Sequence, residues 1–250
     1  MSASATPEPS PPPLHDRVIL LTGATGGLGQ VASRVLAKAG ATVLLLARNE
    51  KRLNALYDLV IADGSPTPVS IPLDLAAQKD AQFEELAQTI EVQLGRLDGI
   101  AHFASQFVQL AALTHQRLPD WEKAFAVNIL APFALTRACL PLLQRAPDAS
   151  VLFCAEAHAL EPGAFWGGFA ASQAALPGLM RTFGEEHTGY PGLRFNLLIP
   201  GPIETPMRER THPGETRAER RPAAELAPLL QYWLGPESSG QNGQIITARA

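Results

Sequence analysis

Short apolar runs alternate with longer segments of helical period along this chain, beginning at residue 18 and continuing nearly to the last residue. Apolar runs of strand length lie at 18–21, 42–47, 69–73, 99–104, 150–154, 194–199 and 244–248. Segments with apolar residues at helical spacing lie at 30–38, 50–62, 78–94, 119–143, 165–186 and 225–234. Mainly apolar strands separated by helices are typical of a parallel sheet that is covered on both faces.

Capping and breaking residues refine two of these predicted helices. Asn49 is a suitable N-cap for the helix at 50–62, because its side chain can accept a hydrogen bond from the first turn. The helix at 119–143 contains Pro132 and Pro141, and we expect these prolines to bend it or to break it late.

Composition places the chain among ordinary globular proteins. At 250 residues, with 46% hydrophobic and 18% charged residues, it suits one α/β domain with about seven strands and a substantial core. The formal charge of −4 argues against nucleic acid as a partner. Cys139 and Cys154 are the two cysteines, which gives no disulfide framework and favours a reducing compartment.

The first residues differ in composition from the rest. Residues 1–14 are rich in proline and lack the apolar segment of a signal peptide, so we expect a disordered tail before a domain at 15–250. We find no run that approaches the roughly 20 apolar residues needed to span a bilayer. The sequence therefore predicts a cytoplasmic protein with no membrane partner.

A glycine-rich turn connects the first predicted strand to the first predicted helix. Gly23, Gly27 and Gly29 have the spacing that lets a backbone turn tightly and approach a pyrophosphate, with Thr25 and Leu28 in the same turn. The amides that open the following helix would then face the phosphates. This context predicts a dinucleotide site, and a tight turn without a ligand is the alternative.

Motifs farther along the chain resemble those of the short-chain dehydrogenase/reductase family. Asp74 and Leu75 match the family's adenine contact, and Asn128 matches the asparagine that supports its active-site water chain. The resemblance covers about residues 16–248 and implies a Rossmann-type, doubly wound single domain with strand order 3-2-1-4-5-6-7. It also implies cofactor contacts at Ala104, Gln173, Pro200, Gly201, Ile203 and Thr205.

The residue after the second strand bears on which nicotinamide cofactor is preferred. An acidic residue there would bind the adenosine ribose of NAD(H), whereas this chain has Ala47 followed by Arg48. A guanidinium matches a phosphate through paired hydrogen bonds, so we expect NADP(H) in preference to NAD(H). A solvated arginine at the start of a helix is the alternative.

The family's catalytic residues are replaced in this chain. The resemblance places the catalytic serine at Glu156, the tyrosine that donates a proton at Phe169, and the lysine that lowers its pKa at Gln173. Ser105 stands where the family has a glycine, and some crowding against the adenosine ribose is expected. A positioned general acid contributes roughly 10²–10⁴ in rate, so chemistry should suffer more than cofactor binding.

Three neighbouring residues could substitute for the missing acid. Glu156 could donate a proton if burial raises its pKa, and His158 or His102 could also serve. Cys154, Glu156 and His158 alternate at the end of a strand, which is only a weak pattern for metal ligands, and we expect no metal. Solvated or structurally satisfied side chains are the alternative for each group.

The segment 204–222 is rich in charge and predicts a loop with one short helix. In the family this region is the mobile lid over the substrate. Its mixed signs favour a solvated surface over a site that attracts an acidic ligand. The arginines concerned are Arg208, Arg210, Arg217, Arg220 and Arg221.

Two functions remain open from the sequence. The first is an NADP(H)-binding relative with weak or no catalysis, acting as a cofactor sensor or as a subunit of a homodimer, homotetramer or hetero-oligomer. The second is an NADPH-dependent reductase of a small carbonyl or an activated double bond, with Glu156 or His158 as the acid. The sequence names no small-molecule substrate.

Overall fold

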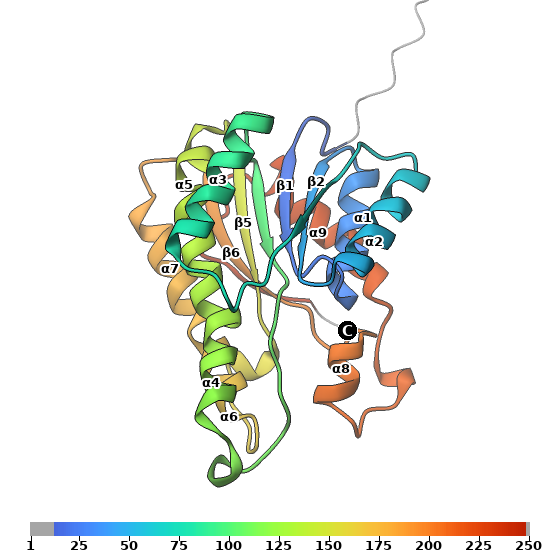
Figure 1. Cartoon of the computed structure of the whole chain (residues 1–250), viewed down its shortest axis with the longest axis vertical. Coiled ribbons are helices and arrows are strands. Elements are labelled where there is room, and N and C mark those ends of the chain that lie inside the picture. Colours follow the sequence, from blue (N-terminus) through green and yellow to red (C-terminus); the bar gives the residue numbers. More distant parts are fainter. Residues whose placement is uncertain (1–12, 249–250) are drawn as a thin grey trace, which may run out of the picture.

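A single parallel sheet forms the centre of the computed structural model, which describes residues 13–248. The sheet has seven strands in the order β3-β2-β1-β4-β5-β6-β7, as predicted, and every neighbouring pair is parallel (Figure 1). The strands are β1 (Val18–Thr22), β2 (Thr42–Ala47), β3 (Val69–Pro72), β4 (Gly99–His102), β5 (Ala149–Cys154), β6 (Leu193–Ile199) and β7 (Ile245–Thr247). The predicted doubly wound α/β fold is therefore confirmed.

Helices cover both faces of the sheet, because side chains alternate across each buried strand. On one face lie α1 (Gly27–Lys38), α2 (Glu50–Ala62) and α9 (Ala227–Leu234), which pack on residues such as Ile19, Leu21 and Leu45. On the other lie α3 (Asp80–Leu94), α5 (Ala131–Arg145) and α7 (Leu176–Glu186), which pack on Leu20, Leu44 and Phe153. Asn49 caps α2 as expected, with its side chain accepting from the Arg52 amide at 2.9 Å.

The long helix after β4 does not break at its prolines. It runs from Leu118 to Arg145 as α4 (Leu118–Phe125), a π-helical turn (Ala126–Leu130) and α5. The Ala131 amide donates to the Ala126 carbonyl across the π turn, and Pro132, which has no amide hydrogen, follows directly. The helix continues past both Pro132 and Pro141 to Arg145, so the expected late break is wrong.

This helix is also the longest apolar segment of the described chain. It has 28 residues, a mean hydropathy of 1.6 in its most apolar window, and 56% of that window buried in the protein. Length and composition alone would suit a membrane span, which the sequence did not suggest. Its contacts with α3 and the sheet are those of a core helix in a layered domain.

A second expected helix, at 165–186, is two helices. The first is α6 (Gly167–Ala174) and the second is α7, which has Pro177 in its first turn. Phe165 has a φ of 74°, in the left-handed region that disfavours a helix start. The segment that we expected to begin the helix is therefore a turn in front of it.

The boundary of the domain lies earlier than the predicted tail suggests. Leu14 is fully buried, and its amide donates to the Ala39 carbonyl at 2.8 Å. It packs with the α1 and α9 side of the core, so it belongs to the domain and not to the tail. Residues 1–12, which make up most of the predicted tail, lie outside the described residues.

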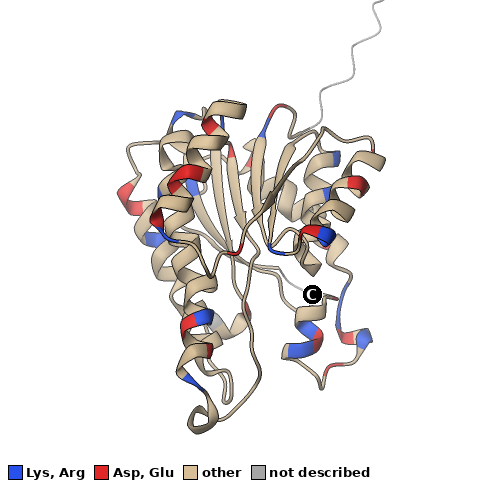
Figure 2. Cartoon of the chain, viewed as in Figure 1, with Lys and Arg blue, Asp and Glu red and all other residues tan. Residues whose placement is uncertain are grey.

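A buried charge cluster joins three strands at the amino ends of the sheet, opposite the cleft described below. Asp148, just before β5, accepts from Arg194 on β6 and from Arg17 before β1, both at 2.6 Å. The Arg194 side chain is 2% exposed and that of Asp148 is 18% exposed. Burial opposes ionisation of Asp148, but the two guanidiniums outweigh it and lower its pKa. Most other charges lie on the outer helices (Figure 2).

We predict that Asp148→Asn lowers the free energy of unfolding by about 3 kcal/mol at pH 7, because it leaves two buried guanidiniums without their anion. The folded-state pKa is below the unfolded value. The stabilisation is therefore complete above pH 4, roughly the unfolded value, and is lost as the pH falls through the folded one. Urea unfolding of both proteins between pH 7 and pH 3 measures this.

The matched control is Glu91→Gln, which breaks an exposed ion pair with Arg145. This change should cost less than about 1 kcal/mol. An Asp148→Asn variant no less stable than the control, or an unchanged difference at low pH, would contradict the prediction.

Candidate functional site

A single cleft at the carboxyl ends of the strands holds most of the residues that the sequence singles out. Its volume is about 380 Å³. Every residue expected to contact a cofactor lines it: Gly23, Thr25, Gly27, Leu28, Gly29, Arg48, Asp74, Leu75, Ala104, Gln173, Pro200, Gly201, Ile203 and Thr205. The substituted catalytic positions Glu156 and Phe169 line the same cleft. Asn128 and His158 lie behind its wall.

The glycine-rich turn is closely packed on its surroundings, which explains why it contains glycine. Gly23 has a φ of 64°, and a Cβ there would lie 2.6 Å from the Ala104 amide nitrogen. A Cβ on Gly29 would lie 2.2 Å from the Gly23 carbonyl oxygen, and one on Gly27 would lie 2.6 Å from the Thr205 side chain. The turn can therefore bring the first amides of α1 to the cleft, which suits a phosphate.

Two arginines stand at the β2 end of the cleft. Arg48 follows β2 and Arg52 lies one turn into α2, and both are exposed and line the cavity. Asp74 lines the same end from the β3 side. The sequence singled out Arg48 alone. Arg48 precedes the N-cap Asn49 and Arg52 lies in the first turn of α2, so no local period in the sequence linked the two arginines.

The positions of the family's tyrosine and lysine lie on α6. Phe169 is 7% exposed and packs edge-on against Phe107, with ring centroids 5.3 Å apart. Gln173 is 2% exposed, and its side-chain oxygen accepts from the Glu156 amide at 3.0 Å. Its nitrogen donates to the Ser105 hydroxyl at 3.4 Å. Phe169 thus places a hydrocarbon ring where the resemblance implies the hydroxyl of a tyrosine. Gln173 places a neutral amide where it implies the ammonium group of a lysine.

The π-helical turn positions Asn128 behind these residues. Its side-chain oxygen accepts from the Gln106 amide at 2.7 Å. Its nitrogen donates to the Gln106 carbonyl at 3.1 Å and to the Ser172 hydroxyl at 2.9 Å. The Asn128 side chain therefore joins the segment after β4 to α6. Gln106 and Ser172 were not singled out in the sequence, because no local pattern links them.

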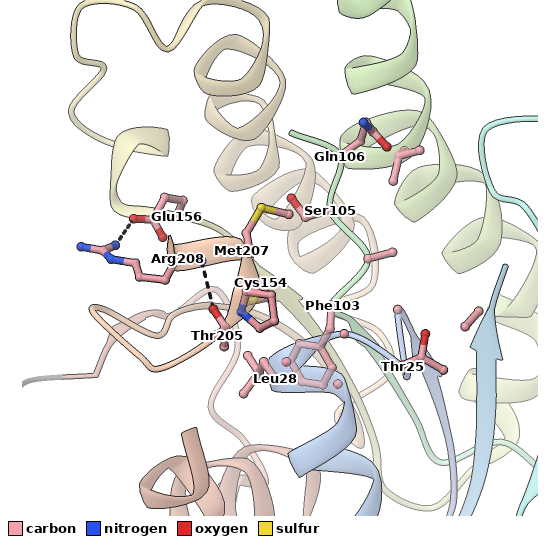
Figure 3. Close-up of a pocket in the computed structure, with 18 of the residues that line it drawn as sticks. Thr25, Leu28, Phe103, Ser105, Gln106, Cys154, Glu156, Thr205, Met207 and Arg208 are labelled. Atoms are coloured by element: carbon pink, nitrogen blue, oxygen red, sulfur yellow. Dashed lines mark hydrogen bonds and ion pairs between the residues drawn. The ribbon is translucent and has the colours of Figure 1, made fainter. Parts of the chain in front are cut away.

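Glu156 is paired with an arginine from the lid. Arg208, in α8 (Pro206–Thr211), donates to Glu156 Oε1 at 2.5 Å (Figure 3). It also donates to both carboxylate oxygens of Glu215. Burial raises the pKa of Glu156, and Arg208 opposes that shift. Arg208 lowers the pKa of Glu215 by hydrogen bonding to it. The side chain of Arg208 is 11% exposed.

The lid is therefore more than a solvated surface. The side chains of Arg208 and Arg220 are 11% and 7% exposed, and both contact Glu215, so the solvated interpretation is wrong for these two. It holds for Arg217, which is 86% exposed. Local sequence could not separate them, because Glu156 lies about fifty residues from Arg208.

The three histidine-bearing positions near the cleft differ in surroundings. His102 is fully buried, bonded to Thr136 Oγ1 at 2.9 Å, and burial lowers its pKa to about 3, so it cannot serve as the substitute acid. His158 stacks on Trp166 with centroids 3.6 Å apart, and burial, with Arg208, lowers its pKa. Burial and then Arg208 lower the pKa of His212 to about 4.

Comparison with known proteins identifies the family. The model of the short chain dehydrogenase family matches residues 17–216. The chain belongs to that family. It is 34% identical to the uncharacterised oxidoreductase YciK of Escherichia coli K12, over 94% of this chain and 93% of that one.

Solved structures of short-chain dehydrogenases have the same fold. One from Pseudomonas syringae has a TM-score of 0.92 and 38% identity, covering 97% of this chain and 98% of the other. One from Escherichia coli CFT073, complexed with NADPH, has a TM-score of 0.92 and 33% identity, covering 97% of this chain and 100% of the other.

The cleft of this short-chain dehydrogenase is lined by the glycine-rich turn and by Phe169 and Gln173. Phe169 has no proton to donate and Gln173 has no charge. Cys154 also lines the cleft, but burial first, and then the Glu156 charge, raise the pKa of its thiol to about 12, so it stays protonated. Glu156 lines the cleft beside these positions, and its carboxylate accepts a hydrogen bond from Arg208.

We predict that Gly29→Ala lowers the free energy of unfolding by about 1–3 kcal/mol, because the added Cβ would overlap the Gly23 carbonyl. The control is Gly178→Ala in α7, where an added Cβ has no atom within 4 Å. That change should be neutral or stabilise by about 0.5–1 kcal/mol. Thermal and urea unfolding measure both. Equal effects of the two variants would contradict the tight packing of the turn.

Proposed function

We propose that this short-chain dehydrogenase binds NADP(H) in its cleft and has lost the carbonyl reduction that its family's tyrosine and lysine support. The observation that carries the proposal is the pairing of a preserved glycine-rich turn with Phe169 and Gln173 at the reaction centre of the same cleft. Both halves are open to test in the purified protein.

Binding of NADP(H) is supported by charge and shape. The turn after β1 offers amides to a pyrophosphate, and Arg48 with Arg52 offers two guanidiniums to a 2′-phosphate. A neighbour of the same fold is complexed with NADPH, which agrees with this assignment. Losing one charge-assisted hydrogen bond removes roughly 1.5–3 kcal/mol, so replacing the family's lysine by Gln173 weakens binding without abolishing it.

Loss of chemistry is supported by the surroundings of α6. Phe169 packs on Phe107 and cannot donate a proton, and the two ends of the Gln173 amide are bonded to Glu156 and Ser105. A missing general acid costs roughly 10²–10⁴ in rate. The pairing of Glu156 with Arg208 is a further obstacle, since a carboxylate held by a guanidinium is a poor proton donor.

The second candidate function is a reductase that uses Glu156 as its acid, and one observation favours it. Burial raises the pKa of Glu156, which is the direction that a proton donor near neutrality needs. His158 is the weaker alternative, because it does not line the cleft and its pKa is lowered. Direct hydride transfer to an activated double bond would need the missing tyrosine less.

A protein of this kind would act as a cytoplasmic cofactor sensor or as a subunit that supports a partner. The outer face of the long helix suits assembly into a homodimer, a homotetramer or a hetero-oligomer. Leu130 is 57% exposed and Phe133 is 39% exposed on that face, and burying such side chains is favourable.

We predict that NADPH binds more tightly than NADH, and that Arg48→Ala weakens NADPH binding about ten- to 150-fold while leaving NADH binding unchanged. The physical reason is the loss of a charged partner for the 2′-phosphate. Calorimetric titration of both cofactors measures it. Lys51→Ala, which removes an equal charge beside the cleft without lining it, is the control. Equal wild-type affinities, or a preference that Arg48→Ala does not reduce, would contradict the assignment.

We predict no appreciable wild-type reduction of ketones, aldehydes or quinones with NADPH. The triple variant Glu156→Ser, Phe169→Tyr, Gln173→Lys should gain at least about 10²-fold, because it restores the proton donor and its cation. Phe169→Tyr alone is the matched control, with the hydroxyl but not the cation, and should gain less. If the wild type does turn over and Glu156→Gln or His158→Ala abolishes that activity, the result would support the substitute-acid mechanism instead.

A further inference from the structure

Three metal-ligating groups converge where the lid meets the end of β5. Glu156 and His158 follow β5, and His212 directly follows α8 in the lid. Glu156 Oε1 lies 4.0 Å from His158 Nδ1 and 3.8 Å from His212 Nε2, and the three atoms all lie within 4.8 Å of one another. The fold therefore adds to Glu156 and His158 a third group from more than fifty residues away.

The two imidazoles are held by their surroundings with these nitrogens facing the carboxylate. His158 Nδ1 is buried and makes no hydrogen bond among the described residues, although its ring is fixed by stacking on Trp166. His212 bonds Thr211 Oγ1 through Nδ1 at 2.9 Å, which leaves Nε2 directed at Glu156. A buried nitrogen without a partner is unusual and calls for a ligand.

We propose that Glu156, His158 and His212 bind a divalent transition-metal ion of the Zn²⁺ class, and that the ion displaces Arg208 from Glu156. Two imidazoles and one carboxylate form a donor set that suits Zn²⁺ and similar ions and disfavours Mg²⁺ and Ca²⁺. Thr211, bonded to the other nitrogen of His212, acts as the outer partner that orients a ligand.

Arg208 is the competitor for the site, and the structure provides its alternative partner. It bonds Glu156 at Oε1, the oxygen that faces both imidazoles, so a cation cannot occupy the cluster while that bond is made. The same guanidinium is already bonded to both oxygens of Glu215. Release from Glu156 therefore leaves Arg208 paired with Glu215, and a metal ion can replace the guanidinium at Glu156.

The cluster needs a small contraction to coordinate an ion. Bonds of about 2.0–2.1 Å to a tetrahedral ion place ligand atoms about 3.4 Å apart. The present spacing extends to 4.8 Å, so the three side chains must move closer together. Because His212 directly follows α8, metal binding would tie the end of that helix to the segment after β5. Helix α8 supplies Met207 and Arg208 to the cleft wall (Figure 3), and Thr211 also lines the cleft. The proposed role of the ion is to position α8, and the ion takes part in no step of a reaction.

The test titrates Zn²⁺ by calorimetry, and Co²⁺ by its visible absorption, into untagged full-length protein. We expect one ion per chain and an absorption band typical of a four- or five-coordinate Co²⁺ site. His158→Gln and His212→Gln should each weaken binding by at least about 10- to 100-fold, the loss that even an outer partner of a ligand causes. Arg208→Met should tighten binding, because it removes the competitor.

Two control variants distinguish this site from other metal-binding groups. Cys154→Ser tests the thiol that alternates with Glu156 and His158 in sequence, and His115→Ala removes an exposed imidazole of the described chain. Both should bind the ions as the wild type does. Circular dichroism and thermal unfolding of every variant without metal confirm that it is folded.

Several outcomes would overturn the proposal. The proposal is wrong if the wild type binds neither Zn²⁺ nor Co²⁺, or if both histidine variants bind the ions as tightly as the wild type does. It is also wrong if Cys154→Ser loses binding. Weaker or unchanged binding in Arg208→Met would also overturn it, since the exchange with the guanidinium would then be absent. Opposite effects of Arg208→Met and His212→Gln cannot both arise from unfolding, so they would support the site.

Discussion

The close approach of backbone segments around the first glycine-rich turn is the constraint on which the cleft depends. Gly23 lies against the Ala104 backbone after β4, and Gly27 lies against Thr205 at the start of the lid. Strands β1 and β4 are neighbours in the sheet, so this contact sits at the point where the chain order reverses. The turn, the segment after β4 and the lid consequently share one packing site, and a side chain added to any of these glycines disturbs all three.

Local signals were enough to predict the sheet and the first half of the cleft. Apolar runs gave the strands within a few residues, and the turn at Gly23, Gly27 and Gly29 was identifiable because its spacing is contiguous in sequence. The pairing of Glu156 with Arg208, and the approach of His212, depend on how the lid folds back over β5. Mixed charge in the lid could not reveal these contacts, because ion pairs between distant segments leave no period in the sequence. The long helix was predicted at 119–143, but the sequence did not predict the π turn in front of Pro132 or the continuation of the helix past Pro141.

The side chains of Phe169, Gln173 and Glu156 are packed or hydrogen-bonded in the fold. Phe169 fills its space against Phe107 and Trp166. Gln173 has partners at both ends of its amide, and Glu156 has an arginine. Each substituted side chain thus satisfies its own polar or apolar requirements in the fold. These three positions are therefore stably packed, with side chains that differ from those that the family resemblance implies.

The proline that follows the π turn has a consequence for a residue behind the cleft. A regular α-helix would use an amide at position 132 to satisfy the Asn128 carbonyl, and proline has none. The π turn directly before it includes Asn128, whose side chain bonds Gln106 and Ser172 from this backbone. Pro132 thus favours the backbone from which Asn128 joins the segment after β4 to α6, although the proline makes none of these bonds itself.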